Sequence, residues 1–254
     1  ESIERGEKTV ENLFGGELYY ISCILELLQT HNIEINELAI INFLNKFSAN
    51  KDEQDYIDYV YDDVRQIAAL AMLIEAQTLW GNSKVKIDLS RAKEIYEEGI
   101  NTLVKDEKNY DIGTMKNLAI ISQYLDLNNN ELISSTLSKY FDKDGFSVYP
   151  NTGNNIMSTK SGLLVYNYLD MELDVEQRNN IIEKILSSQF YDGRFVVGRK
   201  ERESTIIEDT YHGVLLLSEL GEFEQYVKDI EGFYYLKTEE KKLEEYSIYD
   251  NFYL

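Results

Sequence analysis

The sequence predicts an all-α protein, and three observations lead to that prediction. Only 1 proline occurs among 254 residues, and proline is the residue that most strongly interrupts a helix. Apolar residues recur at intervals of three and four, as in the stripe that begins at Leu18 and ends at Leu28, which is the spacing of one helix face. Strand-like alternation is rare, and its best example is Phe195-Val196-Val197.

Strongly apolar helices recur along the chain and alternate with more polar ones. The apolar helices are expected to begin near Gly16, Asp62, Gly113, Ser158 and Glu208, at intervals of 46, 51, 45 and 50 residues. The polar, amphipathic helices between them are expected at Ile35–Phe47, Ser90–Val104, Asn130–Tyr140 and Val175–Gln189. A recurrence of this kind is typical of α-α hairpin repeats, in which neighbouring units bury the inner helix of each pair.

The last two copies of the predicted repeat are the most alike. Tyr140–Phe146 corresponds to Gln189–Phe195, and Ser158–Leu164 corresponds to Asp209–Leu215. Equivalent Asp-Gly pairs lie 48 residues apart, and equivalent Gly-apolar-Leu runs lie 51 residues apart. Asp-Gly suits a turn between an outer and an inner helix, because glycine accepts positive φ and aspartate bonds the local backbone. The first residue of each later segment, with the threonine after it, is expected to cap the inner helix.

The segment Ser188–Phe195, followed by Glu208–Leu217 and Leu220-Gly221, resembles the repeat shared by protein prenyltransferase β subunits and squalene/terpene cyclases. That repeat reads as Gln, Asp-Gly, an aromatic residue, a variable loop, and then Thr-Tyr opening an apolar helix that ends in Leu-Gly. The resemblance covers residues 130–222 and implies an (α/α) toroid or partial toroid of about five to six hairpins. Because no linker or composition break is visible, we predict a single domain over residues 1–254, with residues 231–254 as a closing segment.

The catalytic motifs of those enzymes are matched only in part. Asp209-Thr210-Tyr211-His212 is similar to the Asp-x-Tyr-His stretch that carries a zinc ligand in prenyltransferases. Their Asp-x-Cys motif has no counterpart, since the only cysteine is Cys23. The Asp-x-Asp-Asp acid of class II terpene cyclases is approached only by Asp142-Lys143-Asp144-Gly145, which lacks the last aspartate. The chain is therefore expected to use neither chemistry and to need no metal or cofactor.

The composition limits the partners and leaves the compartment open. There are 46 acidic and 25 basic residues, for a net charge of −21, and such a surface repels the phosphates of nucleic acids and anionic lipids. No apolar run reaches the roughly 18–20 residues that cross a bilayer. We expect no nucleic-acid binding and no membrane insertion. The cytoplasm is the preferred compartment, export with removal of a leader stays open, and the oligomeric state is not indicated.

Candidate site residues gather where the inner helices are expected to begin. The candidate acid/base residues are Asp209, Glu208 and His212, with a helix cap and a structural histidine as the plainer interpretations. The candidate ligand-binding residues are Tyr211, Lys160, Ser158, Tyr166 and Arg65. The preferred function is binding of a hydrophobic, peptide or other small-molecule ligand at a cavity mouth. An enzyme of the terpene-cyclase-like or carbohydrate-active (α/α) type and a protein-interaction scaffold are the alternatives.

Overall fold

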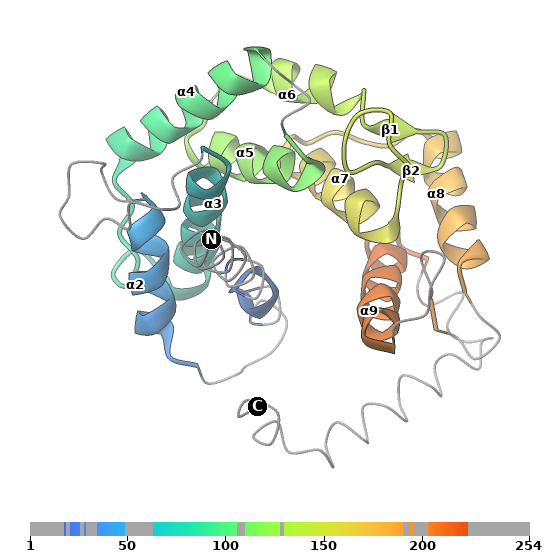
Figure 1. The fold of residues 1–254 in the computed structure, drawn as a ribbon, viewed down its shortest axis with the longest axis horizontal. Coiled ribbons are helices and arrows are strands. Elements are labelled where there is room, and N and C mark those ends of the chain that lie inside the picture. The colour runs from blue at the N-terminus through green and yellow to red at the C-terminus, as the bar shows by residue number, and fades with distance from the viewer. Residues whose placement is uncertain are drawn as a thin grey trace, which may run out of the picture. The chain divides into compact units, whose positions relative to one another are not determined.

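The computed structural model of the chain is mostly helical, as the sequence predicts (Figure 1). The structure describes residues 18, 21–25, 28, 35–48, 63–105, 110–127, 130–189, 194–195 and 203–222, without the side chains of residues 63, 130 and 203–208. The labelled elements are α2 (Glu37–Ser48), α3 (Asp63–Trp80), α4 (Leu89–Lys105), α5 (Ile112–Tyr124), α6 (Asn130–Leu137), β1 (Phe141–Asp142), β2 (Gly145–Phe146), α7 (Ile156–Tyr168), α8 (Val175–Ser187) and α9 (Glu203–Glu219).

The chain divides into two compact units, each described by itself. The first comprises Glu1–Lys139 with Leu164–Met171, and the second comprises Tyr140–Leu163 with Glu172–Leu254. In the first unit α3 packs against α2, α4 and α5, and in the second unit α8 packs against β2 and α9. The first apolar helix, predicted to begin near Gly16, starts outside the described residues, and so does the predicted closing segment 231–254. The single domain stays a prediction.

The helices are of two kinds, in the predicted alternation. Helix α5, one of the predicted inner helices, has buried residues on most of its circumference, namely Ile112, Thr114, Met115, Leu118, Ala119, Ile120, Ile121 and Ser122. Helix α8, one of the predicted outer helices, buries only a stripe, formed by Ile181, Ile182 and Ile185. A helix with apolar residues on one face packs against its neighbours on that side only, whereas a helix with apolar residues all round is covered on every side. The difference in burial therefore follows from the sequence pattern.

The inner helices end in a common way that repeats the predicted period. A residue with positive φ follows α3, α5, α7 and α9, namely Gly81, Asp126, Asp170 and Gly221. These residues are 45, 44 and 51 positions apart. After α5, α7 and α9 the next amide donates to a carbonyl five residues earlier, in the pairs Leu127–Ser122 at 3.0 Å, Met171–Tyr166 at 2.9 Å and Glu222–Leu217 at 2.9 Å. This is the Schellman arrangement, which satisfies carbonyls that a helix end would leave unpaired.

Replacing Asp126 or Asp170 with glycine is expected to raise the free energy of unfolding by about 0.5–1 kcal/mol, because glycine adopts positive φ without a Cβ clash. Urea unfolding measures the change. The converse control is Gly221→Ala, since an added Cβ there meets no atom within 4 Å and only the backbone is tested. That variant is expected to lose about 1 kcal/mol. Two aspartate variants less stable than the parent would contradict this account of the helix ends.

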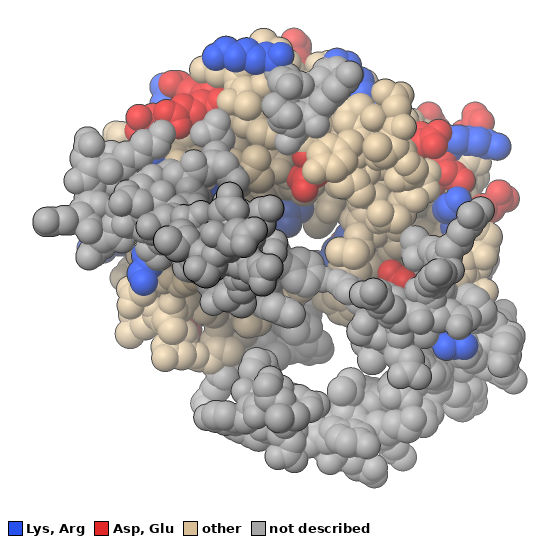
Figure 2. All heavy atoms as spheres, in the orientation of Figure 1, with Lys and Arg blue, Asp and Glu red and all other residues tan. Residues whose placement is uncertain are grey.

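On the described surface that faces the viewer in Figure 2, acidic and basic side chains are mixed rather than segregated. Figure 2 shows Lys and Arg side chains beside Asp and Glu side chains on the face that it presents. Among the close pairs, Lys84 and Glu37 are 2.7 Å apart, and Lys93 and Glu97 are 3.8 Å apart on one face of α4. Exposed pairs of this kind contribute little to stability. Their role is to compensate part of the negative charge locally.

Candidate functional site

A short β-hairpin connects α6 to the loop before α7 and forms the Asp-Gly turn of the repeat. β1 and β2 pair antiparallel, with Phe141 opposite Phe146 and Asp142 opposite Gly145. The rings of Phe141 and Phe146 meet edge to face, with centroids 4.9 Å apart. Since Phe146 is fully buried, the hairpin is held by an aromatic side chain as well as by its backbone pairs.

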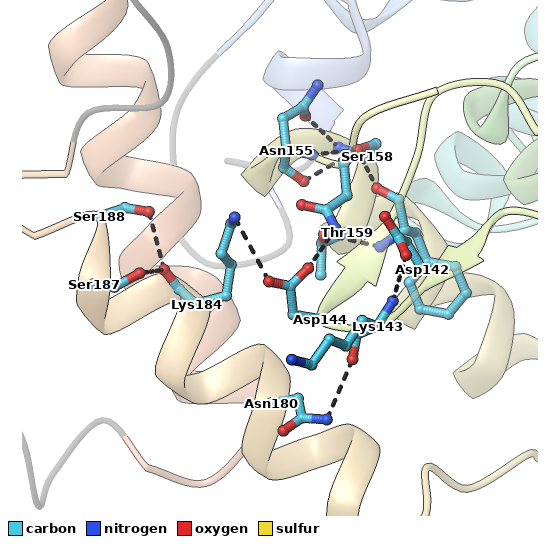
Figure 3. A network of polar contacts seen from close by, with 12 residues as sticks. Asp142, Lys143, Asp144, Asn155, Ser158, Thr159, Asn180, Lys184, Ser187 and Ser188 are labelled. Carbon is cyan, nitrogen blue, oxygen red and sulfur yellow. Dashed lines mark hydrogen bonds and ion pairs between the residues drawn. The ribbon is translucent and has the colours of Figure 1, made fainter. Parts of the chain in front are cut away.

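Polar contacts tie the hairpin turn to its surroundings (Figure 3). The carboxylate of Asp144 accepts a hydrogen bond from Asn154 Nδ2 at 2.7 Å and lies 3.6 Å from Lys184 Nζ of α8. Asn180 Nδ2, also on α8, donates to the carbonyl of Lys143 at 3.2 Å. Asp144 is therefore a turn residue, as predicted, and its carboxylate contacts two side chains of the protein. Its counterpart Asp192 lies outside the described residues.

Both copies of the repeat make the same contact between the segment before the inner helix and that helix. The amide of Phe146 donates to Thr159 Oγ1 at 3.1 Å, and the amide of Phe195 donates to Thr210 Oγ1 at 3.0 Å. Each ring also lies against a glycine three residues after the threonine. A Cβ added to Gly162 would lie 2.2 Å from the Phe146 ring, and a Cβ added to Gly213 would lie 2.8 Å from the Phe195 ring. We call this arrangement the Phe-Thr-Gly contact.

The cap predicted at Ser158 is wrong, because α7 begins at Ile156 and is capped by Asn155. The amide of Ser158 donates to Asn155 Oδ1 at 2.9 Å, and the amide of Asn155 donates to Ser158 Oγ at 3.0 Å. The Ser158 hydroxyl also donates to the carbonyl of Phe146 at 2.5 Å. Ser158 thus links the hairpin to α7, and its hydroxyl makes hydrogen bonds within the protein.

The cap predicted at Asp209 is also wrong, because α9 begins at Glu203. Asp209 lies six residues inside the helix and is buried. The predicted start near Glu208 followed the apolar pattern, whereas α9 opens with the polar residues Glu203, Ser204 and Thr205. The adjacent pair Ile206-Ile207 that follows is too short to show a helical period. Glu208 is on α9, but its side chain lies outside the described residues.

Replacing Thr159 with valine is expected to lower the free energy of unfolding by about 1–3 kcal/mol, because the buried Phe146 amide would lose its acceptor without a change in side-chain shape. Chemical unfolding monitored by circular dichroism measures the loss. Thr159→Ser keeps the hydroxyl and serves as the control, with a smaller expected loss. A loss for Thr159→Ser with no loss for Thr159→Val would show that the methyl group, and not the hydrogen bond, matters at Thr159.

Four of the predicted site residues come together in the second unit. Lys160 lies on α7, and Asp209, Tyr211 and His212 lie on α9. Lys160 Nζ lies 5.7 Å from the centroid of the Tyr211 ring, within the range of a cation–π interaction. The rings of Tyr211 and His212 have centroids 5.3 Å apart. Asp209 is three positions before His212, so their side chains share one side of α9. We call these four residues the polar cluster.

Burial distinguishes the polar cluster from ordinary surface charge. Only 6% of Lys160, 7% of His212 and 9% of Asp209 is exposed, and Tyr211 is half-buried. All four residues take part in further interactions of the fold. Lysine and aspartate are seldom buried unless they have partners, so the burial of Lys160 and Asp209 in one unit sets the polar cluster apart. Its groups can donate hydrogen bonds, offer a positive charge, and exchange a proton through imidazole or carboxylate.

Other predicted site residues are not part of the polar cluster. Arg65 on α3 and Tyr166 on α7 belong to the first unit. Arg91, which is not among the predicted site residues, is buried and donates to Gln66 Oε1 at 2.7 Å and to Glu94 Oε2 at 2.6 Å. Its place four residues before Ile95, in the buried stripe of α4, is the signal that would have revealed it.

Neither a metal centre nor a membrane span is found in the described part of the chain. Within those residues, no three side chains of His, Cys, Asp or Glu are grouped so that they could hold a metal ion. The described helices include none with the length and apolar character that crossing a bilayer requires.

In comparisons with known proteins, the chain matches no protein-family model, no curated protein and no solved structure. The likeness of residues 130–222 to the prenyltransferase and cyclase repeat therefore stays a resemblance in sequence.

Proposed function

We propose that the chain is an (α/α) toroid of the prenyltransferase/terpene-cyclase-like kind that binds a ligand at the polar cluster. The observation that carries the proposal is the burial of Lys160, Asp209 and His212, which all belong to the second unit. The repeated helix ends and the two Phe-Thr-Gly contacts support the repeat architecture. Standard zinc and Asp-x-Asp-Asp catalysis are not part of the proposal.

The ligand that suits the polar cluster is a hydrophobic molecule or peptide with a polar end. Lys160, Tyr211 and His212 supply donors and a cation for the polar end. One turn along α9 from Tyr211, the side chains of Val214 and Leu215 are half-buried and offer apolar surface. Ligand sites generally combine apolar surface with a few placed polar groups. The proposed ligand matches that combination.

An enzyme that uses Asp209 and His212 as acid and base is the second candidate. The observation in its favour is that both side chains are buried and lie one turn apart on α9. General acid–base catalysis requires such groups within reach of one reacting atom. A terpene-cyclase-like or carbohydrate-active reaction is the class of reaction proposed for this candidate.

Replacing Lys160 with methionine or His212 with alanine is expected to weaken binding about tenfold or more, which corresponds to about 1.4 kcal/mol. The probes are oleate, farnesol and a short peptide with apolar C-terminal residues, and isothermal titration calorimetry measures their affinities. The matched control is Lys116→Met, since Lys116 is half-buried on α5 in the first unit. We expect that control to bind as the parent does.

The outcomes distinguish an error in the proposed site from an error in the proposed ligand class, and they distinguish binding from catalysis. Probes that bind the parent and both cluster variants equally would rule out the polar cluster as the site, and binding of no probe would rule out the ligand class. Circular dichroism verifies that each variant is folded. Mass spectrometry of the probe after incubation tests the second candidate, because Asp209→Asn should then abolish conversion while binding persists.

A further inference from the structure

We draw no further inference here: the strongest candidate, the half-exposed stripe that Met157, Ser161, Leu164 and Tyr168 form along α7, is a largely apolar helix face, and nothing in the described residues shows what covers it.

Discussion

Replacing Phe146 with alanine is expected to lower the free energy of unfolding by about 3–5 kcal/mol, the range for removal of a buried aromatic ring. The ring is fully buried and lies between Phe141 and the backbone of α7 at Gly162. Glycine has no side chain that could move into the space left behind. The cavity would therefore stay open, and a large part of the stability of a typical domain would be lost.

Urea unfolding of Phe146→Ala should be compared with that of two other variants. Tyr149→Ala is the control, since 41% of that residue is exposed and its truncation should cost little. Phe195→Ala removes the equivalent ring of the next copy, which is also buried, and should cost a similar amount to Phe146→Ala. A loss for Phe146→Ala no larger than that for Tyr149→Ala would refute the structural role of the ring.

Replacing Gly162 with alanine is expected to lower the free energy of unfolding by about 1–3 kcal/mol, the cost of overpacking a filled site. In a helix interior the same change should otherwise stabilise the protein by about 0.5–1 kcal/mol, because glycine has the higher backbone entropy when unfolded. A net loss therefore requires a clash, and a Cβ at Gly162 would lie 2.2 Å from the Phe146 ring. Gly213→Ala should cost less, since the corresponding distance is 2.8 Å.

Gly113→Ala on α5 is the matched control for the helical glycines. The nearest atom to an added Cβ there is Asp111 Oδ1 at 3.4 Å, an ordinary contact distance, so this variant should be as stable as the parent or slightly more stable. The double variant Gly162→Ala/Phe146→Leu should lose less stability than Gly162→Ala and Phe146→Leu lose together as single variants, because the two positions share one contact. Simple additivity would show that the glycine and the ring act independently.

The positions of most helices could be predicted from the sequence, because burial imposes its period on the apolar residues. α3 and α7 begin within two residues of the predicted starts at Asp62 and Ser158. α9 begins five residues before the predicted start at Glu208, since its first three residues are polar and the Ile206-Ile207 pair after them is too short to show a helical period. A polar helical turn and a polar loop have the same hydropathy, and only the backbone distinguishes them.

The candidate site could be predicted only in part. Lys160 and Tyr211 follow equivalent threonines in the two copies, and the structure brings them together. The sequence did not reveal that Ser158 and Thr159 bond the hairpin backbone. Such bonds depend on the path of a connecting loop, whereas sequence periodicity reports only the face of a helix on which a residue lies.

The Phe-Thr-Gly contact has a consequence for the loops that it closes. Phe146 and Thr159 are 13 positions apart, whereas Phe195 and Thr210 are 15 positions apart, and yet the two hydrogen bonds have nearly the same length. The intervening chain can thus change in length without disturbing its anchor points, since a longer closed loop adds only a small entropic cost. A short foreign peptide inserted before Gly153 is therefore expected to be tolerated, because residues 151–153 are exposed and an added Cβ at Gly153 would meet no atom within 4 Å.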